Sequence, residues 1–130
     1  MSDDAVPSEF LHGDITGQII GAAFEVHRVL GYGFLERVYQ RALQVELERN
    51  GRKVIVEHDI GVLYKGFDVG HYRADLLVDD LVVVELKVSK EYSSLDEAQL
   101  LNLLKATRLQ VGLLINFGRN RCEFKRFIRS

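Results

Sequence analysis

The sequence has one cysteine, one proline and no long hydrophobic run, and each of these shortages excludes a class of protein. The single Cys122 cannot form an internal disulfide, and no cluster of cysteine and histidine offers the ligands of a structural zinc site. No apolar run approaches the length that crosses a bilayer, and no secretory signal is visible at the N-terminus. We therefore expect a soluble, cytoplasmic protein that does not bind a membrane.

What is present is the composition of an ordinary globular domain, with 130 residues, 47% hydrophobic and 28% charged. This length supports one core, so we expect a single domain at residues 14–130 after a flexible N-terminal arm at residues 1–13. The net charge is −2, but residues 105–130 contain seven bases and one acid. This basic end could contact phosphates, or it could be an edge strand that charge protects against aggregation.

Hydrophobic spacing predicts two helices followed by a sheet that a third helix interrupts. The predicted helices lie at about 14–30, 34–49 and 93–108, and the predicted strands at 53–64, 67–78, 81–88, 110–117 and 122–129. Gly31 ends the first helix, Gly70 marks a candidate bulge, and Ser93 is the candidate N-cap of the third helix. The order α-α-β-β-β-α-β-β predicts an α/β fold, a mixed β-sheet with helices packed on it.

Charged residues stand in the most apolar of the predicted hairpins, "RADLLVDDLVVVELKV" at residues 73–88. Successive strand residues point to opposite faces, so the length of the turn decides which charges meet. A two-residue loop would set Asp75 against Val84 and split the charges between the faces. A three-residue loop at 79–81 would instead set Asp75 opposite Glu85, and Arg73 opposite Lys87.

Two interpretations of these charges remain open. In the first, the bases neutralise the acids in two cross-strand ion pairs. In the second, a divalent cation bridges Asp75 and Glu85, because opposed carboxylates repel each other and hard cations prefer oxygen ligands. Lys87 would then stand over the same site, where it could orient a water or stabilise charge on a phosphate.

A strand aspartate followed by a strand with Glu-x-Lys, in this order of elements, resembles the PD-(D/E)XK nuclease superfamily. The segment "GFLERVY" at residues 33–39 resembles the signature of the GxxExxY proteins, a small bacterial and archaeal family of that superfamily. The resemblance extends over residues 15–127. It implies a restriction-endonuclease-like fold and a nuclease that hydrolyses phosphodiester bonds with Mg²⁺ or Mn²⁺.

The resemblance also implies roles for individual residues. Asp75, Glu85 and the backbone carbonyl of Leu86 would be metal ligands, and Lys87 would be the catalytic lysine. Glu36 matches a helical glutamate that contacts the metal or its waters. The spacing of Glu36 at the margin of the buried stripe of its helix is compatible with that role, and also with a solvated glutamate.

Four further residues carry weaker signals. Gln99 resembles a substrate-binding glutamine of exonuclease-like members, although Leu103 replaces the tyrosine that follows it there. Arg73 could bind a substrate phosphate or simply balance Asp75. Tyr39 and His27 are predicted to be packing residues, with the Tyr39 hydroxyl bonded to the site or to the backbone.

Two functions therefore compete. The first is a metal-dependent nuclease, with DNA favoured over RNA as substrate and endo- and exonuclease action both open. The second is a nucleic-acid-binding or partner-binding module with weak or no hydrolysis, acting as a homodimer or as a partner's subunit. An α/β protein with structural ion pairs is a third, less favoured hypothesis.

Overall fold

The computed structural model describes residues 11–90 and 93–129, and the elements in them follow the predicted order. The described part of the chain contains helices α1 (Gly13–Leu30), α2 (Glu36–Arg49) and α3 (Ser94–Thr107) and strands β1 (Val54–Tyr64), β2 (Phe67–Val78), β3 (Val82–Lys87), β4 (Val111–Phe117) and β5 (Cys122–Ile128). Most of the predicted arm at residues 1–13 lies outside the described residues. Among those described, no helix is long and apolar enough to cross a membrane.

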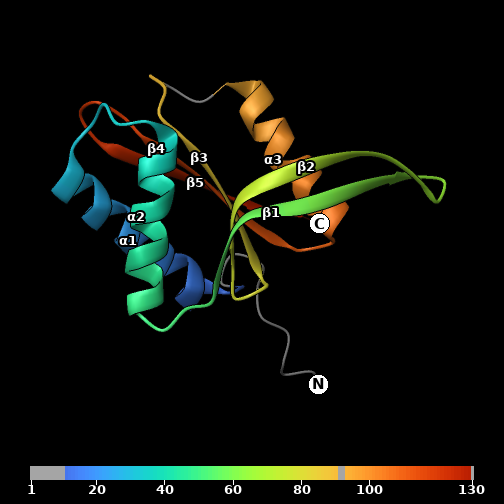
Figure 1. The fold of residues 1–130 in the computed structure, drawn as a ribbon, viewed down its shortest axis with the longest axis horizontal. Helices are drawn as coiled ribbons and strands as arrows, with labels where there is room; N and C mark the ends of the chain where they lie inside the picture. The colour runs from blue at the N-terminus through green and yellow to red at the C-terminus, as the bar shows by residue number, and fades with distance from the viewer. Residues whose placement is uncertain (1–10, 91–92, 130) are drawn as a thin grey trace.

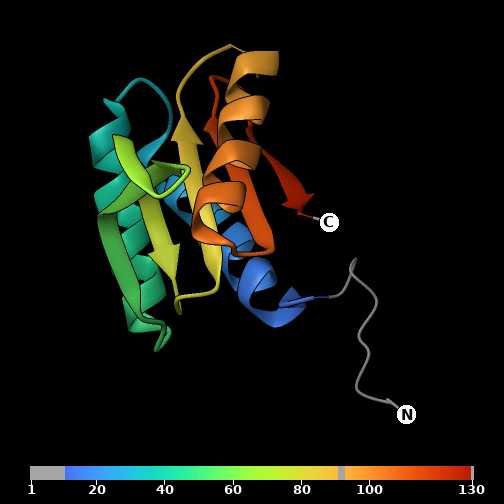
Figure 2. The same cartoon turned by 90° about the vertical axis from the view of Figure 1, so that its right-hand side faces the viewer.

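The five strands form one mixed sheet in the order β1-β2-β3-β4-β5. Neighbouring strands are antiparallel except β3 and β4, which are parallel and are connected through α3. Helices α1 and α2 cover one face of the sheet and α3 covers the other (Figure 2). The predicted mixed α/β fold and the central position of β3 are therefore confirmed.

The core consists of two apolar layers, one on each face of the sheet. Val84 and Leu86 of β3 pack with α1 and α2, whereas Val83 packs with Leu100 and Leu104 of α3. Both faces of β3 are thus buried, which is the reason for its nearly continuous run of valines. Cys122 is half-buried at the start of β5 and packs against the first layer, as expected of a small apolar residue.

The turn between β2 and β3 has the three-residue loop on which the predicted register depends. Val78 pairs with Val82, Leu77 with Val83 and Leu76 with Val84. The loop is tight, because Asp79 and Asp80 both adopt positive φ angles of 52° and 58°. Leu81 N–H donates a hydrogen bond to the carbonyl of Val78 across 3.0 Å, which closes the turn.

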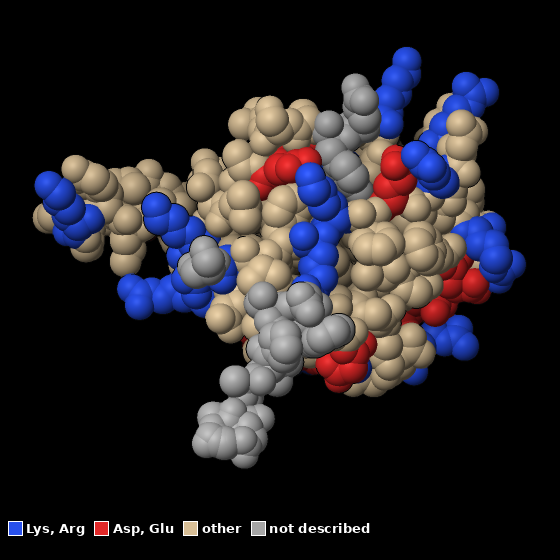
Figure 3. Space-filling view, turned by 180° about the vertical axis from the view of Figure 1, so that it is seen from behind, with Lys and Arg blue, Asp and Glu red and all other residues tan. Residues whose placement is uncertain are grey.

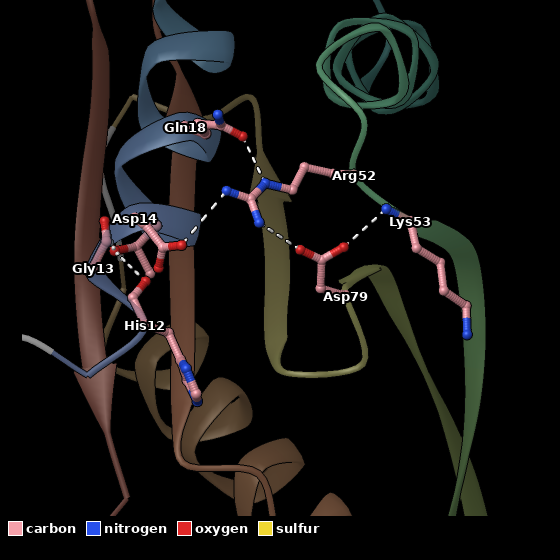
Figure 4. A network of polar contacts seen from close by, with 8 residues as sticks. His12, Gly13, Asp14, Gln18, Arg52, Lys53 and Asp79 are labelled. Atoms are coloured by element: carbon pink, nitrogen blue, oxygen red, sulfur yellow. Dashed lines mark hydrogen bonds and ion pairs between the residues drawn. The ribbon is translucent and has the colours of Figure 1, made fainter. Parts of the chain in front are cut away.

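A polar network anchors this turn to the rest of the domain (Figure 4). Arg52, in the connection between α2 and β1, lies 2.8 Å from Asp79 through Nη1 and donates from Nε to Gln18 Oε1 at 2.6 Å. Its Nη2 lies 3.8 Å from Asp14 of α1, and the backbone N–H of Lys53 donates to Asp79 Oδ1 at 2.9 Å. We call Arg52, Asp79, Gln18, Asp14 and Lys53 the turn network.

The ladder between β2 and β3 ends at Leu76 and Val84, so the predicted pairing of Arg73 with Lys87 was wrong. From this point β2 leaves β3 and continues with β1 as a long hairpin, in which Arg73 faces Asp59. The hairpin projects from the sheet beside α3 (Figure 1). Its register shifts between Val62 and Leu63, opposite Gly70, which confirms the predicted bulge.

Candidate active site

The carboxylates of Asp75 and Glu85 lie where β2 and β3 separate, and we call this site the fork. The backbone N–H of Asp75 donates to Glu85 Oε1 at 3.1 Å, and the N–H of Leu86 donates to Asp75 Oδ2 at 2.7 Å. Each carboxylate thus accepts a hydrogen bond from the backbone of the facing strand. Asp75 and Glu85 therefore meet, as the three-residue loop requires.

Burial makes the fork unfavourable for negative charge. It is the main cause that raises the pKa of Glu85 to about 8, and the neighbouring Asp75 charge adds to it. Burial also raises the pKa of Asp75, although the N–H of Leu86 and the charge of Lys87 oppose this shift. The two acids hold their positions through backbone donors, but the fork lacks enough positive charge to balance both of them.

Glu36 brings a third carboxylate to the fork from the opposite layer. It is the first residue of α2, it is half-buried, and it lies close enough to Asp75 for the two carboxyl groups to affect each other's pKa. Its pKa is raised, mainly by burial and then by the charge of Asp75. A helix N-terminus favours a negative charge, which offsets part of this cost. The structure therefore places Glu36 at the fork, as its predicted role requires.

The position of α2 is fixed by aromatic and amide contacts. The Tyr39 hydroxyl donates to the carbonyl of Gly31 at 2.7 Å, and its ring stacks on Phe117 with centroids 4.4 Å apart. The buried Gln40 donates from Nε2 to the backbone carbonyl of Asp75 at 3.0 Å. Tyr39 is thus the predicted packing residue bonded to the backbone, and Gln40 ties the helix directly to the fork.

Lys87 lies between the fork and the start of α3. Its Nζ is 3.5 Å from Asp96 Oδ1, and its charge lowers the pKa values of Asp75, Glu85 and Glu36 against the effect of burial. Asp96 also belongs to a capping box, in which it and Ser93 exchange hydrogen bonds of 3.1 Å. The predicted N-cap Ser93 is confirmed, and its capping box positions the partner of Lys87.

The buried Asn116 of β4 holds the chain just after Lys87. Its side chain accepts from the N–H of Ser89 at 3.0 Å and donates to the carbonyl of Ser89 at 2.7 Å. Sequence reasoning missed Gln40, Asn116 and the contact of Asp96 with Lys87. The available signal was a polar residue within a buried stripe, as in "GLLINF" for Asn116.

The remaining predicted residues lie beside the fork rather than in it. Arg73 is exposed, and it makes no ion pair with any residue in the described part of the chain. It therefore does not balance Asp75 through an ion pair. Gln99 is half-buried on α3 and lines a groove between this helix and the β1–β2 hairpin. His27 has a packing role, with Nε2 2.7 Å from the carbonyl of Gly118.

Several of the seven bases at residues 105–130 use their side chains for contacts within the domain. Lys125 Nζ lies 3.0 Å from Glu97 of α3, and Arg121 lies 3.1 Å from Glu123. Arg129 donates to the backbone carbonyls of Leu109 and Arg108. For these three bases the contacts favour the interpretation of a charged edge strand; Lys105 and Arg108 make no ion pair within the described residues.

The fork offers oxygen donors suited to a hard divalent cation. Within residues 11–90 and 93–129, no three side chains of His, Cys, Asp or Glu are already arranged as a metal centre. The donors are the half-buried carboxylate of Asp75 and the buried carboxylate of Glu85, both with raised pKa values, and a cation would offset their mutual repulsion. Carbonyl and water oxygens commonly complete such a ligand set. The chemistry of these donors therefore fits a Mg²⁺ or Mn²⁺ ion.

Comparisons with known proteins concern the family and the fold of the chain. A family model described as the PD-(D/E)XK nuclease superfamily matches residues 13–127. Among solved structures, the chain is similar to one titled "Crystal structure of SSO0001", with a TM-score of 0.56 and 18% identity over 73% of this chain and 50% of the other. Our chain thus spans about half the length of that protein. This likeness shows a shared fold.

A second similar structure is an alkaline exonuclease (LHK-Exo) from Laribacter hongkongensis. Its TM-score is 0.49 and its identity 15%, over 88% of this chain and 82% of the other. No curated protein matches the sequence. The family match covers most of the chain and includes every residue of the fork.

Proposed function

The chain belongs to the PD-(D/E)XK nuclease superfamily, and from that premise we propose that it hydrolyses phosphodiester bonds of nucleic acid with a divalent metal ion. The observation that carries this proposal is the fork, where Asp75 and Glu85 accept hydrogen bonds from each other's strand. The segment "GFLERVY" further supports a place among the GxxExxY proteins. Its glutamate is Glu36, the third acid of the fork.

In this proposal Asp75 and Glu85 hold a Mg²⁺ or Mn²⁺ ion, with the carbonyl of Leu86 as a further ligand. Glu36 contributes from α2, either directly or through a water. When bound, such an ion lowers the pKa of a coordinated water and screens the negative charge of the phosphate. Lys87 orients the attacking water or stabilises the charge on the phosphate, and Asp96 and Asn116 position this lysine and its strand.

The substrate is a nucleic acid, with DNA favoured, and Gln99 and Arg73 are proposed to contact it. Arg73 suits a phosphate because it is exposed and makes no ion pair within the described residues. A homodimer or a partner subunit could supply further contacts. The half-buried single cysteine fits a reducing cytoplasm, where we place the protein.

A cleavage assay tests this function. The purified protein is incubated with single-stranded DNA, duplex DNA or RNA and with Mg²⁺ or Mn²⁺, beside Glu85→Gln and Lys87→Ala. We expect each substitution to lower the cleavage rate by about 10²–10³-fold. Asp80→Asn is the control, because Asp80 lies in the exposed turn at the far end of β3 and pairs only with Lys53 among the described residues.

Cleavage that survives both substitutions would overturn the assignment of the site. If no substrate is cleaved while Mn²⁺ still raises the melting temperature of the unsubstituted protein, the binding module becomes the better hypothesis. Activity that falls equally in Asp80→Asn would show that any lost charge on the hairpin impairs the fold.

A further inference from the structure

A groove lies between the β1–β2 hairpin and α3. Its volume is about 470 Å³. Gln99, in its wall, lies three residues after Asp96, the partner of Lys87. Tyr72, in the opposite wall, lies three residues before Asp75 on β2. The walls of the groove thus belong to the strand that carries Asp75 and to the helix that carries the partner of Lys87.

The walls of the groove combine an aromatic ring with apolar and amide groups. The hairpin contributes Leu63 and Tyr72, which are 67% and 49% exposed. Helix α3 contributes the amides of Gln99 and Asn102. Such a wall offers a flat ring for stacking, apolar surface around it, and donors and acceptors for the edge of a planar polar ring.

The charged residues that line the groove are all basic. Lys105 and Arg108 line its α3 side, and none of its described lining residues is an acid. Neither base makes an ion pair with another described residue, unlike Lys125, which pairs with Glu97. On the surface in Figure 3, the Lys and Arg side chains near the projecting hairpin, at the left, have no Asp or Glu group beside them. The groove is therefore suited to an anionic ligand.

We propose that this groove binds an unpaired nucleotide of the strand that the fork cleaves. The base would stack on Tyr72, the amides of Gln99 and Asn102 would bond its edge, and Lys105 and Arg108 would contact the flanking phosphates. In a duplex each base is stacked between neighbouring bases, so only a single strand or a frayed end can present the face of a base to Tyr72. The substrate class is thus single-stranded nucleic acid.

That the bound strand is cleaved at the fork rests on the proposed function, but the binding of the strand in the groove does not. Binding is therefore measured in EDTA, where no metal-dependent cleavage occurs. Fluorescein-labelled twelve-residue oligo-dT and oligo-U and a blunt duplex of the same length are titrated with the full chain, and anisotropy gives each Kd. We expect either single strand to bind more tightly than the duplex.

Tyr72→Ala is the main variant, and it should raise the Kd for the single strands roughly 5- to 100-fold through the loss of stacking. Tyr72→Phe should stay within about twofold of the unsubstituted protein, because the ring remains. Tyr72→Leu keeps apolar bulk without an aromatic face and should resemble Tyr72→Ala. Tyr64→Ala, an exposed tyrosine of the same hairpin outside the groove, is the matched control.

Lys105→Gln tests the phosphate contacts. It should flatten the dependence of log Kd on log salt concentration by about 0.7, the value for one phosphate of a single strand. Arg41→Gln is its control, because Arg41 is exposed on α2, which covers the opposite face of the sheet. The slope for Arg41→Gln should equal that of the unsubstituted protein.

The inference is overturned if Tyr72→Ala and Tyr72→Leu bind single strands as the unsubstituted protein does, or if they weaken duplex binding equally. It is overturned for RNA alone if only oligo-dT responds, and for DNA alone if only oligo-U responds. Sensitivity to Tyr72 without any cleavage would support the groove but not the nuclease. Cleavage that is indifferent to Tyr72 would support the nuclease but not the groove.

Discussion

The fork and the turn network lie at the two ends of the pairing between β2 and β3, and they treat charge in opposite ways. Both contain half-buried or buried acids that accept hydrogen bonds from backbone N–H groups. At the turn, burial raises the pKa of Asp79, but the N–H of Lys53 and the guanidinium of Arg52 outweigh it and lower the pKa. At the fork, burial prevails, and the pKa of Glu85 rises to about 8.

The difference lies in how many bases each region contains. At the turn, Arg52 bonds Asp79 and also reaches Gln18 and Asp14, so the acids have a partner. At the fork, the described residues place Glu36, Asp75 and Glu85 against Lys87, which also serves Asp96. A network that stabilises the fold balances its charges, whereas an uncompensated group of acids is typical of a site for a cation.

The largest effect should come from Asp75→Asn, which removes a charge from the fork but keeps the shape of the side chain. We expect cleavage to fall by about 10²–10³-fold or more. The rise in melting temperature that Mg²⁺ or Mn²⁺ gives the unsubstituted protein should also disappear, since a ligand stabilises only the state that binds it. Scanning calorimetry with metal and with EDTA measures the second effect without any substrate.

Asp79→Asn is the matched change at the other end of the pairing. Asparagine tolerates the positive φ of 52° found at this position. It should keep both the cleavage rate and the stabilisation by metal, while lowering the melting temperature in either condition. If Asp75→Asn and Asp79→Asn lose the metal-dependent rise in melting temperature equally, the fork and the turn network do not differ in metal binding.

A smaller effect should follow from Gln40→Met, which removes the donor to the carbonyl of Asp75 and keeps the volume of the side chain. Residues that hold a metal ligand in place typically contribute 10–100-fold in metal affinity. We therefore expect the Mg²⁺ concentration for half-maximal cleavage to rise by about that factor, with a smaller change in the rate at saturating metal. A purely structural role would lower stability without moving this metal dependence.

Gln44→Met makes the same change one turn further along α2, where the amide bonds only Glu48 among the described residues, at 3.4 Å. Its metal dependence should equal that of the unsubstituted protein. If both variants need more metal, the loss of helix stability rather than the contact with Asp75 is responsible.

Much of the fold follows from periodicity, because each element has one buried stripe or two buried faces that local sequence displays. The register at the fork also followed from sequence, since three loop residues fix which side chains oppose each other. The prediction that Arg73 pairs with Lys87 was wrong because it assumed that β2 and β3 stay together, whereas their ladder ends at Leu76 and Val84 and Arg73 pairs with Asp59 of β1.

The supporting contacts of the site could not be predicted in the same way. Gln40 bonds a backbone group 35 residues away, and Asn116 bonds one 27 residues away. The pattern of a single helix or strand shows that such a residue is polar and buried, but not which distant carbonyl it meets. Only the packing of α2 and β4 onto the sheet determines these partners.

Arg52→Met should affect stability alone. It leaves Asp79 without its guanidinium, and a hydrogen bond between charged groups that are only about one-fifth exposed is worth about 1–2 kcal/mol. The free energy of unfolding in urea should fall by that amount, with no change in cleavage. Lys53→Met is the control, since its pair with Asp80 is more than half exposed and contributes about 0–1 kcal/mol.

The smallest effect is the dependence of the turn network on pH. The folded-state pKa of Asp79 is lowered, so the unfolded chain binds more protons in acid and the contribution of Asp79 grows as pH rises. This contribution is complete above the unfolded pKa of about 3.9 and is lost as pH falls through the lower folded value. The difference in unfolding free energy between the unsubstituted protein and Asp79→Asn should therefore be constant from pH 5 to 7 and shrink below about pH 4. Taking this difference cancels the titration of the acids at the fork, which both proteins share. If this difference in unfolding free energy instead grows in acid, Asp79 is held by its shape rather than by its charge. The contrast with the fork would then have no electrostatic basis.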